Sequence, residues 1–468
     1  MSTSPFKTYF DEVAETDGDE ECRAWLARVF DSKRDLVDFV GRCLQGAGVG
    51  TYAGFLKGSF NFSCRINFSD GQDVIIRFPK PGHTAFREEK VMNEVRIMDY
   101  LRQNTTLPVP HVHSWGLTRE SPQQLGPFII MDFVDGTLLS TILKQPNEPD
   151  LVLNPEIDNA LLNKVYHQIA GYILQLSQLT FSQIGAISKD HNSNVWSVAA
   201  RPLTYNMNEL ATVAGYPNDQ FSTQPFNRTS DYLGSIAKEH LTHLWTQRNI
   251  AGNPEIARGR FIARHRLLHL IPKYCVDDDG PFIPFCDDMR PSNMLVDPGT
   301  LRITAILDFE FTNAMPAQFT YDPPWWLLLS GPEMWLDRCS VQEFLALYQP
   351  RMEQFLRALE QVEEECGART AQPNGLSLSS KMRYSWKTGR FWFDYAMRKS
   401  FDLDVVYWTA LRMHDENVEC LEDGLLPELE SFIQTKLEQF KVYQEECSIR
   451  FQPIDEFGTA PTERITNE

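Results

Sequence analysis

The segment Cys286-Asp-Asp-Met-Arg-Pro-Ser-Asn-Met-Leu-Val-Asp-Pro-Gly-Thr-Leu-Arg-Ile-Thr-Ala-Ile-Leu-Asp-Phe-Glu310 carries the strongest indication of the fold. Two short apolar runs lie on either side of Asp297-Pro-Gly299 and predict a tight hairpin, because Asp, Pro and Gly favour turns. A hairpin brings its two ends together, so we expect Asn293 and Asp308 to lie side by side at its open end.

The polar residues at the ends of this hairpin suggest a metal site beside a catalytic acid. Asn293 and Asp308 offer amide and carboxylate oxygens, which are ligands that Mg²⁺ prefers. Asp288 precedes Asn293 in the pattern D-x-x-x-x-N, and a kinase catalytic loop followed by its metal-binding loop has this layout. Each residue alone could be a turn or hairpin cap, so it is the trio that favours a catalytic role.

The composition is that of a globular protein and excludes several classes of function. Of the 468 residues, 42% are apolar and 23% are charged. The net charge of −19 argues against a nucleic-acid-binding surface, which needs clustered Lys and Arg. No apolar run is long enough to span a membrane, and no secretory signal follows Met1. The 9 cysteines are scattered singly, so we expect reduced thiols and a cytoplasmic protein.

The N-terminal part, residues 1–50, is expected to be a helical extension. Apolar residues recur at helical spacing from about residue 20 to residue 45. The glycine cluster Gly46-Ala-Gly-Val-Gly-Thr51 resembles a dinucleotide-binding loop only superficially. It follows a helix instead of a strand, and Thr51 stands where the third glycine should be. We interpret the cluster as a connector.

Residues 51–134 are expected to form a small antiparallel α+β lobe. Apolar and polar residues alternate from Phe60 to Phe68, and the apolar run 74–78 returns after a turn, which predicts a hairpin. A helix that carries Glu94 follows, and then a buried strand at 128–131.

Residues 135–468 are expected to form a larger, mainly helical lobe. Asn154 and Pro155 predict the start of a helix, as N-cap and first position. The polar stretch 187–228 is interpreted as an insertion with little regular structure. The hairpin 286–310 interrupts the helices, and further helices follow it. A junction near Asp132–Gly136 would leave a cleft between the lobes, the usual location of a ligand.

Several segments in the same order resemble the aminoglycoside phosphotransferase and choline-kinase-like family. The likeness extends from about Gly54 to Trp326 and rests on Gly58-Ser-Phe-Asn61, Val74-Ile-Ile-Arg77, Glu94, Pro108-Val-Pro110, the D-x-x-x-x-N pattern, Asp308-Phe-Glu310 and Asp322-Pro-Pro-Trp-Trp326. The resemblance implies a two-lobed, protein-kinase-like fold. It also implies an enzyme that uses ATP and Mg²⁺ to phosphorylate a hydroxyl group of a small molecule.

The resemblance also implies a role for each matching position. Asp288 would be the catalytic base, and Asn293 and Asp308 would bind Mg²⁺. The remaining roles concern the nucleotide: a phosphate loop of Gly58, Ser59 and Asn61, a cationic strand residue Arg77 paired with Glu94, and a hinge from Asp132 to Val134 whose backbone would bind adenine.

Two departures from the family pattern keep a second function open. Arg77 stands where kinases usually carry Lys, and Cys286 stands where the family usually has His. Both would suit a pseudokinase, a nucleotide-binding or protein-binding module without turnover. The intact trio Asp288, Asn293 and Asp308 favours the enzyme. The identity of the acceptor, the choice between ATP and GTP and the oligomeric state cannot be predicted from these residues.

Overall fold

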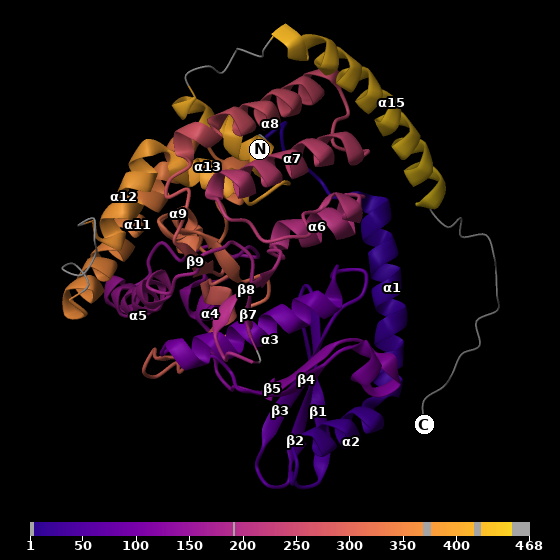
Figure 1. The fold of residues 1–468 in the computed structure, drawn as a ribbon, viewed down its shortest axis with the longest axis vertical. Coiled ribbons are helices and arrows are strands. Elements are labelled where there is room, and N and C mark those ends of the chain that lie inside the picture. Colours follow the sequence, from indigo (N-terminus) through magenta and orange to yellow (C-terminus); the bar gives the residue numbers. More distant parts are fainter. Residues whose placement is uncertain (1–3, 191, 368–375, 416–422, 452–468) are drawn as a thin grey trace.

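The computed structural model describes residues 4–190, 192–367, 376–415 and 423–451. Five strands form the sheet of the smaller lobe: β1 (Gly50–Lys57), β2 (Asn61–Phe68), β3 (Asp73–Pro79), β4 (Val112–Gly116) and β5 (Phe128–Asp132). They are antiparallel and lie in the order β1-β2-β3-β5-β4 (Figure 1). The predicted hairpin is β2 and β3. The edge strands β1 and β4 were not predicted. Gly116 is the only buried residue in these two strands, so they lack the apolar pattern of a buried strand.

Helices cover both faces of this sheet. The alternating side chains of β3 divide between them: Ile76 belongs to the buried cluster that contains Trp25 of α1 (Glu12–Asp31), and Ile75 belongs to the cluster that contains Val91 of α3 (Arg87–Asn104). This alternation is the period-two pattern of a strand buried on both sides. It also turns Arg77 toward the face that α3 covers.

The N-terminal extension consists of two helices. The first is α1, and the second is α2 (Lys33–Cys43). Ser32 separates them, and its hydroxyl donates a hydrogen bond to the Arg28 carbonyl over 2.7 Å, which ends α1. The predicted connector is also shorter than expected, because Gly50 and Thr51 already belong to β1.

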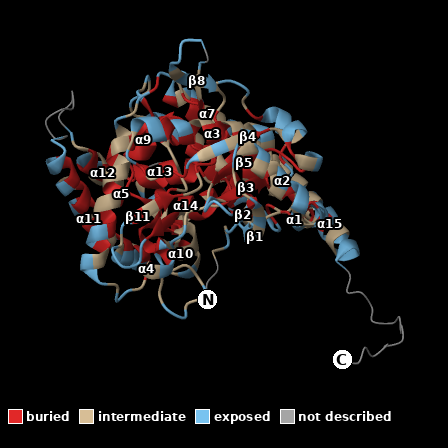
Figure 2. Ribbon diagram, turned by 90° about the horizontal axis from the view of Figure 1, so that it is seen from below, coloured by how far each residue is buried: buried red, intermediate tan, exposed pale blue. Residues whose placement is uncertain are grey.

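The larger lobe is mainly helical, and the predicted α+β architecture with two lobes is confirmed. Its helices are α4 (Leu139–Leu143), α5 (Asn159–Ser177), α6 (Tyr205–Val213), α7 (Thr229–Thr246), α8 (Pro254–Tyr274), α9 (Ala317–Thr320), α10 (Pro332–Arg338), α11 (Val341–Glu365), α12 (Leu378–Thr388), α13 (Arg390–Met397), α14 (Leu403–Thr409) and α15 (Leu426–Arg450). Its strands are β6 (Thr137–Leu138), β7 (Ala186–Lys189), β8 (Trp196–Ala200), β9 (Phe282–Phe285), β10 (Met294–Val296), β11 (Ile303–Ile306) and β12 (Asn313–Pro316). The buried residues fill the middle of the molecule (Figure 2).

Two predictions for this lobe were wrong. Asn154 and Pro155 do not begin a helix, because the Asn154 side chain accepts a hydrogen bond from the Glu156 amide in a turn. The helix α5 begins at Asn159, with Asp158 as its N-cap. The stretch 187–228 is also more regular than predicted, since it completes β7 and contains β8 and α6.

The hairpin predicted from residues 286–310 is confirmed. Its strands β10 and β11 pair antiparallel, and β6 adds a third strand. Beyond the paired strands, the Leu307 amide donates a hydrogen bond to the Asn293 carbonyl over 2.7 Å. Asn293 and Asp308 therefore lie at the same end of the hairpin, as the sequence predicted.

Within the described part of the chain, no helix is both long and apolar enough to cross a membrane.

Candidate active site

A cavity of about 690 Å³ lies between the two lobes. The loop Gly58–Asn61 lines it from the smaller lobe, and Asp288, Asn293 and Asp308 line it from the hairpin. The structure thus brings six of the predicted site residues to one space: Gly58, Ser59, Asn61, Asp288, Asn293 and Asp308.

The carboxylate of Asp288 is held by two neighbours in its own loop. Its Oδ2 accepts a hydrogen bond from the Asn293 amide nitrogen over 2.7 Å, and its Oδ1 pairs with Arg290 Nε at 2.6 Å. Burial raises the pKa of Asp288 above its ordinary value, although Arg290 and Lys399 act in the opposite direction. A carboxylate with a raised pKa is a stronger base than an exposed one, which suits proton abstraction.

Asp308 has the properties of a metal ligand. Its φ of +68° is unusual for a residue other than glycine, and such backbone is frequent at functional sites. Its Oδ1 is buried without a hydrogen-bond partner among the described residues. Burial and the nearby Glu310 raise the pKa of Asp308 well above its usual range. A buried oxygen that lacks a donor and faces a second acid fits a bound cation.

Asn293 completes the pair of oxygens. Its amide nitrogen is committed to Asp288, so the group that it can offer to a metal is the amide oxygen. Asn293 and Asp308 together therefore fit Mg²⁺, whose remaining ligands would be phosphate oxygens and water. No group of three or more His, Cys, Asp or Glu side chains suited to a metal occurs among the described residues.

Arg77 and Glu94 form the ion pair that the sequence suggested. Arg77 Nη2 contacts Glu94 Oε2, and Arg77 Nη1 lies 3.8 Å from Asp308 Oδ1. Both side chains of the ion pair are buried, with exposed fractions of 10% for Arg77 and 1% for Glu94. The guanidinium group thus connects α3 to the end of the hairpin. Neither residue lines the cavity itself.

A second buried cation, Lys90, was missed by the sequence analysis. Lys90 Nζ donates a hydrogen bond to Asn61 Oδ1 over 2.8 Å and forms an ion pair with Glu310. The Asn61 amide nitrogen donates to the same carboxylate over 2.8 Å. Lys90 lies one helical turn before Glu94, and this i,i+4 spacing was the available signal. The three side chains tie the loop of the smaller lobe to the hairpin end of the larger lobe.

The predicted hinge lies away from this cavity. Neither Asp132 nor Val134 is among its lining residues. The Asp132 carboxylate accepts a hydrogen bond from the His111 amide and contacts His113 Nε2 at 2.7 Å. The role of the hinge in adenine binding stays a prediction.

Cys286 links the catalytic loop to Asp308. Its sulfur lies 3.9 Å from the Asp308 carbonyl oxygen, to which it donates a hydrogen bond. Burial raises the pKa of the Cys286 thiol, which therefore stays neutral and acts as a small donor. This contact gives Cys286 a structural part in the loop.

The larger lobe also contributes acidic side chains to the lining of the cavity. They come from α6, α7, α10 and the turn before α14, and are Glu209, Glu239, Glu333 and Asp402. Burial raises the pKa of Glu209 to about 7 and that of Glu239 to about 8. The basic lining residues Arg398 and Lys399 both contact Asp287. The sequence analysis missed these acids because no motif surrounds them and Glu209 falls in the supposed insertion.

Comparison with known proteins gives a family and several relatives. Residues 55–359 match the model of the phosphotransferase enzyme family. The clavilactone A biosynthesis cluster protein Y of Ampulloclitocybe clavipes is 23% identical over 291 residues, which are 57% of this chain and 62% of the relative. The altered inheritance of mitochondria protein 9, mitochondrial, of Debaryomyces hansenii is 26% identical over 165 residues, which are 35% of this chain and 25% of the relative. The chain thus spans less than two thirds of the length of either relative.

The solved structures that match the chain share little sequence with it. A putative aminoglycoside phosphotransferase from Ralstonia eutropha is 17% identical, with a TM-score of 0.46, and the match covers 88% of this chain and 98% of the other. An ethanolamine kinase from Plasmodium vivax is 11% identical, with a TM-score of 0.41 and coverage of 86% and 85%. Because the family model spans more than half of the sequence, including the whole hairpin, the chain belongs to the phosphotransferase enzyme family.

Proposed function

We propose that the protein transfers the γ-phosphoryl group of ATP to a hydroxyl group of a small molecule. Asp288 is the base that accepts or orients the acceptor proton, and Asn293 and Asp308 are the Mg²⁺ ligands. The loop Gly58–Asn61 covers the nucleotide phosphates, where backbone N–H groups can approach oxygens closely.

One observation carries this proposal. Asp288, Asn293 and Asp308 all face the same cavity, together with the loop Gly58–Asn61. Phosphoryl transfer needs little covalent chemistry from a protein, so its catalysis depends on positioning and on charge. A base, two oxygen ligands and a phosphate loop around one space are what that reaction requires.

The charges around the hairpin fit the steps of the transfer. Mg²⁺, when bound, neutralises charge on the phosphate oxygens. Arg77 adds a positive charge 3.8 Å from Asp308 Oδ1 and does not change protonation near neutral pH. Arg290 and Asn293 fix the Asp288 carboxylate in one orientation, so that an incoming hydroxyl meets a preorganised acceptor of its proton.

The lining of the larger lobe supports an acceptor that carries a positive charge. Four carboxyl groups, those of Glu209, Glu239, Glu333 and Asp402, line the cavity, and Lys399 is the nearby cation of Glu209 and Asp402 as well as of Asp287. Burial makes the ionised forms costly and raises the pKa of Glu209 to about 7 and that of Glu239 to about 8. An amine on the acceptor would offset that cost.

The alternative without turnover has one supporting observation. Both oxygens of Asp288 are engaged by Arg290 and Asn293, so the base is paired before any acceptor arrives. The two functions differ in product formation. We expect incubation of the protein with γ-labelled ATP, Mg²⁺ and a metabolite extract to give a labelled small molecule. Absence of any labelled product, with Mg-ATP binding retained, would favour the pseudokinase.

A further inference from the structure

The N-terminal segment, residues 4–11, crosses the larger lobe before α1 begins; Pro5 and Phe6 lie in a turn, and residues 7–11 follow it without helix or turn. Its side chains alternate. Ser4, Phe6, Thr8 and Phe10 are partly buried, whereas Pro5, Lys7 and Tyr9 are exposed. A period of two along an extended chain means that one face lies against the protein and the other faces solvent. One side of the segment therefore lies against the larger lobe, and the segment pairs with no sheet in the described structure.

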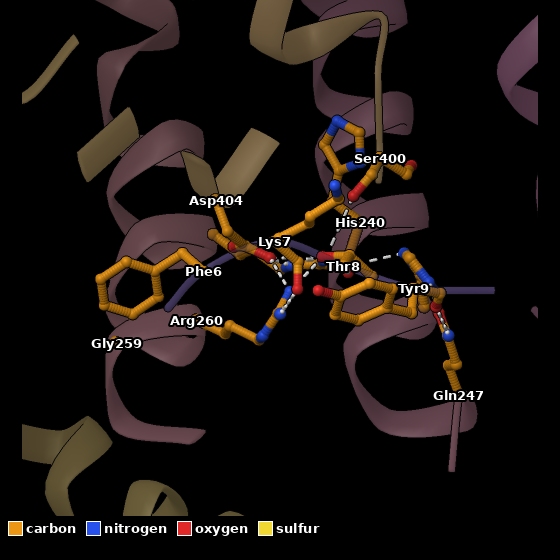
Figure 3. Close-up of polar contacts among 12 residues, drawn as sticks. Phe6, Lys7, Thr8, Tyr9, His240, Gln247, Gly259, Arg260, Ser400 and Asp404 are labelled. Atoms are coloured by element: carbon orange, nitrogen blue, oxygen red, sulfur yellow. Dashed lines mark hydrogen bonds and ion pairs between the residues drawn. The ribbon is translucent and has the colours of Figure 1, made fainter. Parts of the chain in front are cut away.

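Side chains of the larger lobe hold the backbone of this segment (Figure 3). Arg260 donates to the Lys7 carbonyl over 2.8 Å, and Gln247 donates to the Tyr9 carbonyl over 2.7 Å. Asn249 donates to the Phe10 carbonyl over 2.8 Å. Hydrogen bonds to three carbonyls within four residues fix the path of the chain independently of its side chains.

The first of these anchors is itself fixed in the core. Arg260 and Arg264 of α8 share the carboxylate of Asp404, which is fully buried. Gly259 lets α8 approach closely, since a Cβ there would lie 2.3 Å from the Phe6 ring. That ring stacks on Trp408 with 5.3 Å between centroids. The segment thus lies in a groove of the larger lobe that Gly259, Arg260 and Trp408 form around Phe6 and Lys7.

The inward side chains at the end of the segment reach the cavity. Thr8 and Phe10 both line it. The Phe10 ring packs edge-on against Phe401 with 4.8 Å between centroids. Phe401 precedes Asp402 and follows Lys399 by two residues, and both of these charged residues line the cavity. Phe10 is therefore part of the cavity wall beside Lys399 and Asp402.

We propose that the N-terminal segment is a wall of the acceptor site and that Thr8 and Phe10 determine which acceptor fits. This inference rests on the proposed function. The segment lies outside residues 55–359, the part of the chain that the family model matches. Its position depends on contacts with α8 and α14, which lie outside the hairpin that holds Asp288, Asn293 and Asp308.

A kinetic experiment compares two neighbouring aromatic residues of the segment. Phe10→Ala opens the wall, and Tyr9→Ala is the matched control, because the Tyr9 side chain is 61% exposed. The full-length variants receive γ-labelled ATP and serial dilutions of one metabolite extract. We expect Phe10→Ala to need about tenfold more extract for half-maximal labelling or to label a different product, as the loss of apolar contacts in a pocket predicts. The half-saturating ATP concentration should stay within about twofold of wild type.

A second experiment needs no turnover. Thr8→Cys and Tyr9→Cys are treated with the cationic aminoethyl and the anionic sulfonatoethyl methanethiosulfonates, and labelling of the N-terminal peptide is followed by mass spectrometry. The labelling is carried out above about pH 8, where Glu209 and Glu239 lose their protons, so the cavity should concentrate the cation and exclude the anion. We expect the ratio of cationic to anionic labelling rates in Thr8→Cys to exceed the ratio in Tyr9→Cys by about tenfold at low salt.

The two experiments separate the wall from the proposed function. Equal labelling ratios in the two cysteine variants would contradict the proposal that the segment lines the acceptor site. A Phe10→Ala protein that labels the wild-type product at the wild-type extract concentration would contradict it as well. If Phe10→Ala does not fold, Phe10→Leu replaces it in the same comparison. If the wild type transfers no label at all, the proposed function fails, and the labelling ratios alone decide whether the segment lines the cavity.

Discussion

Arg77 Nη1 lies 3.8 Å from Asp308 Oδ1, while the other end of the same guanidinium group contacts Glu94. One cation from β3 therefore serves both a buried acid on α3 and the predicted metal ligand at the hairpin. A Lys side chain ends in a single ammonium group and has no fork to share in this way. This geometry gives a physical account of why Arg stands at the position where kinases usually carry Lys.

The first prediction concerns Arg77. Arg77→Ala leaves Glu94 buried without its partner, so we expect a loss of about 3–5 kcal/mol in the free energy of unfolding, together with weaker ATP binding. Arg77→Lys restores one charge and should bind ATP comparably to wild type. Urea unfolding and ATP titration of both variants measure the two effects. Wild-type ATP affinity in Arg77→Ala would mean that the ion pair is structural only.

The second prediction concerns the metal. Mg-ATP should raise the melting temperature of the wild-type protein, and EDTA should abolish the gain, because a ligand that binds only the folded state stabilises it. Asp308→Asn retains the shape of the side chain and removes its charge, so it should lose the metal-dependent part of the shift. Asp297→Asn, in the turn at the other end of the hairpin, is the control that should retain it. An unchanged shift in Asp308→Asn would remove Asp308 from the metal site.

The third prediction concerns the contact between the lobes at Lys90. Lys90 and Glu310 are both buried, and each single variant leaves the other charge without its partner in this ion pair. Lys90→Met and Glu310→Gln should therefore each lower the free energy of unfolding by about 3–5 kcal/mol. The double variant should recover part of that loss, since neither charge is then left alone. Additive losses in the double-mutant cycle would show that the two side chains do not interact in solution.

The fourth prediction concerns the pH dependence of stability. Burial raises the pKa of Glu239 to about 8, whereas a glutamate in an unfolded chain titrates near about 4.3. Between these values the folded chain holds a proton that the unfolded chain has released, so the free energy of unfolding falls as the pH rises. Glu239→Gln removes this titration. We expect it to be more stable than wild type at pH 8, by on the order of 2–4 kcal/mol, and the difference to shrink toward pH 5.

Urea unfolding at both pH values tests this expectation. Glu438→Gln is the control, because its side chain is exposed on α15. A stability difference between Glu239→Gln and wild type that does not change from pH 5 to pH 8 would contradict the raised pKa of Glu239.

The features that the sequence predicted correctly depend on residues that are close together in the chain. The hairpin from 286 to 310 is contiguous, so its turn and its two apolar runs were enough to bring Asn293 and Asp308 together. The hairpin of β2 and β3 followed from its period of two. The break at Ser32 and the failed start of a helix at Asn154 are local too, but each depends on a side chain that bonds to nearby backbone and competes with the helix.

The rest of the site depends on contacts between distant parts of the chain. Asn61 and Glu310 are 249 residues apart and meet only because the lobes close over one another. Glu209 and Phe10 have no neighbours in sequence that suggest a pocket. Their contribution comes from the packing of α6 and the N-terminal segment against the larger lobe, and periodicity within an element carries no information about such packing.

The central claim is that Asp288 acts in phosphoryl transfer, and one measurement tests it most directly. Asp288→Asn keeps the shape of the side chain and removes the carboxylate, so it should leave ATP affinity nearly unchanged and lower the rate of transfer by about 10²-fold or more. The rate is followed first as hydrolysis of γ-labelled ATP to water and then with the labelled acceptor. A loss of rate at unchanged ATP affinity is the result that our account predicts. Equal rates in wild type and Asp288→Asn, with no labelled product from any extract, would contradict it and leave a nucleotide-binding module without turnover.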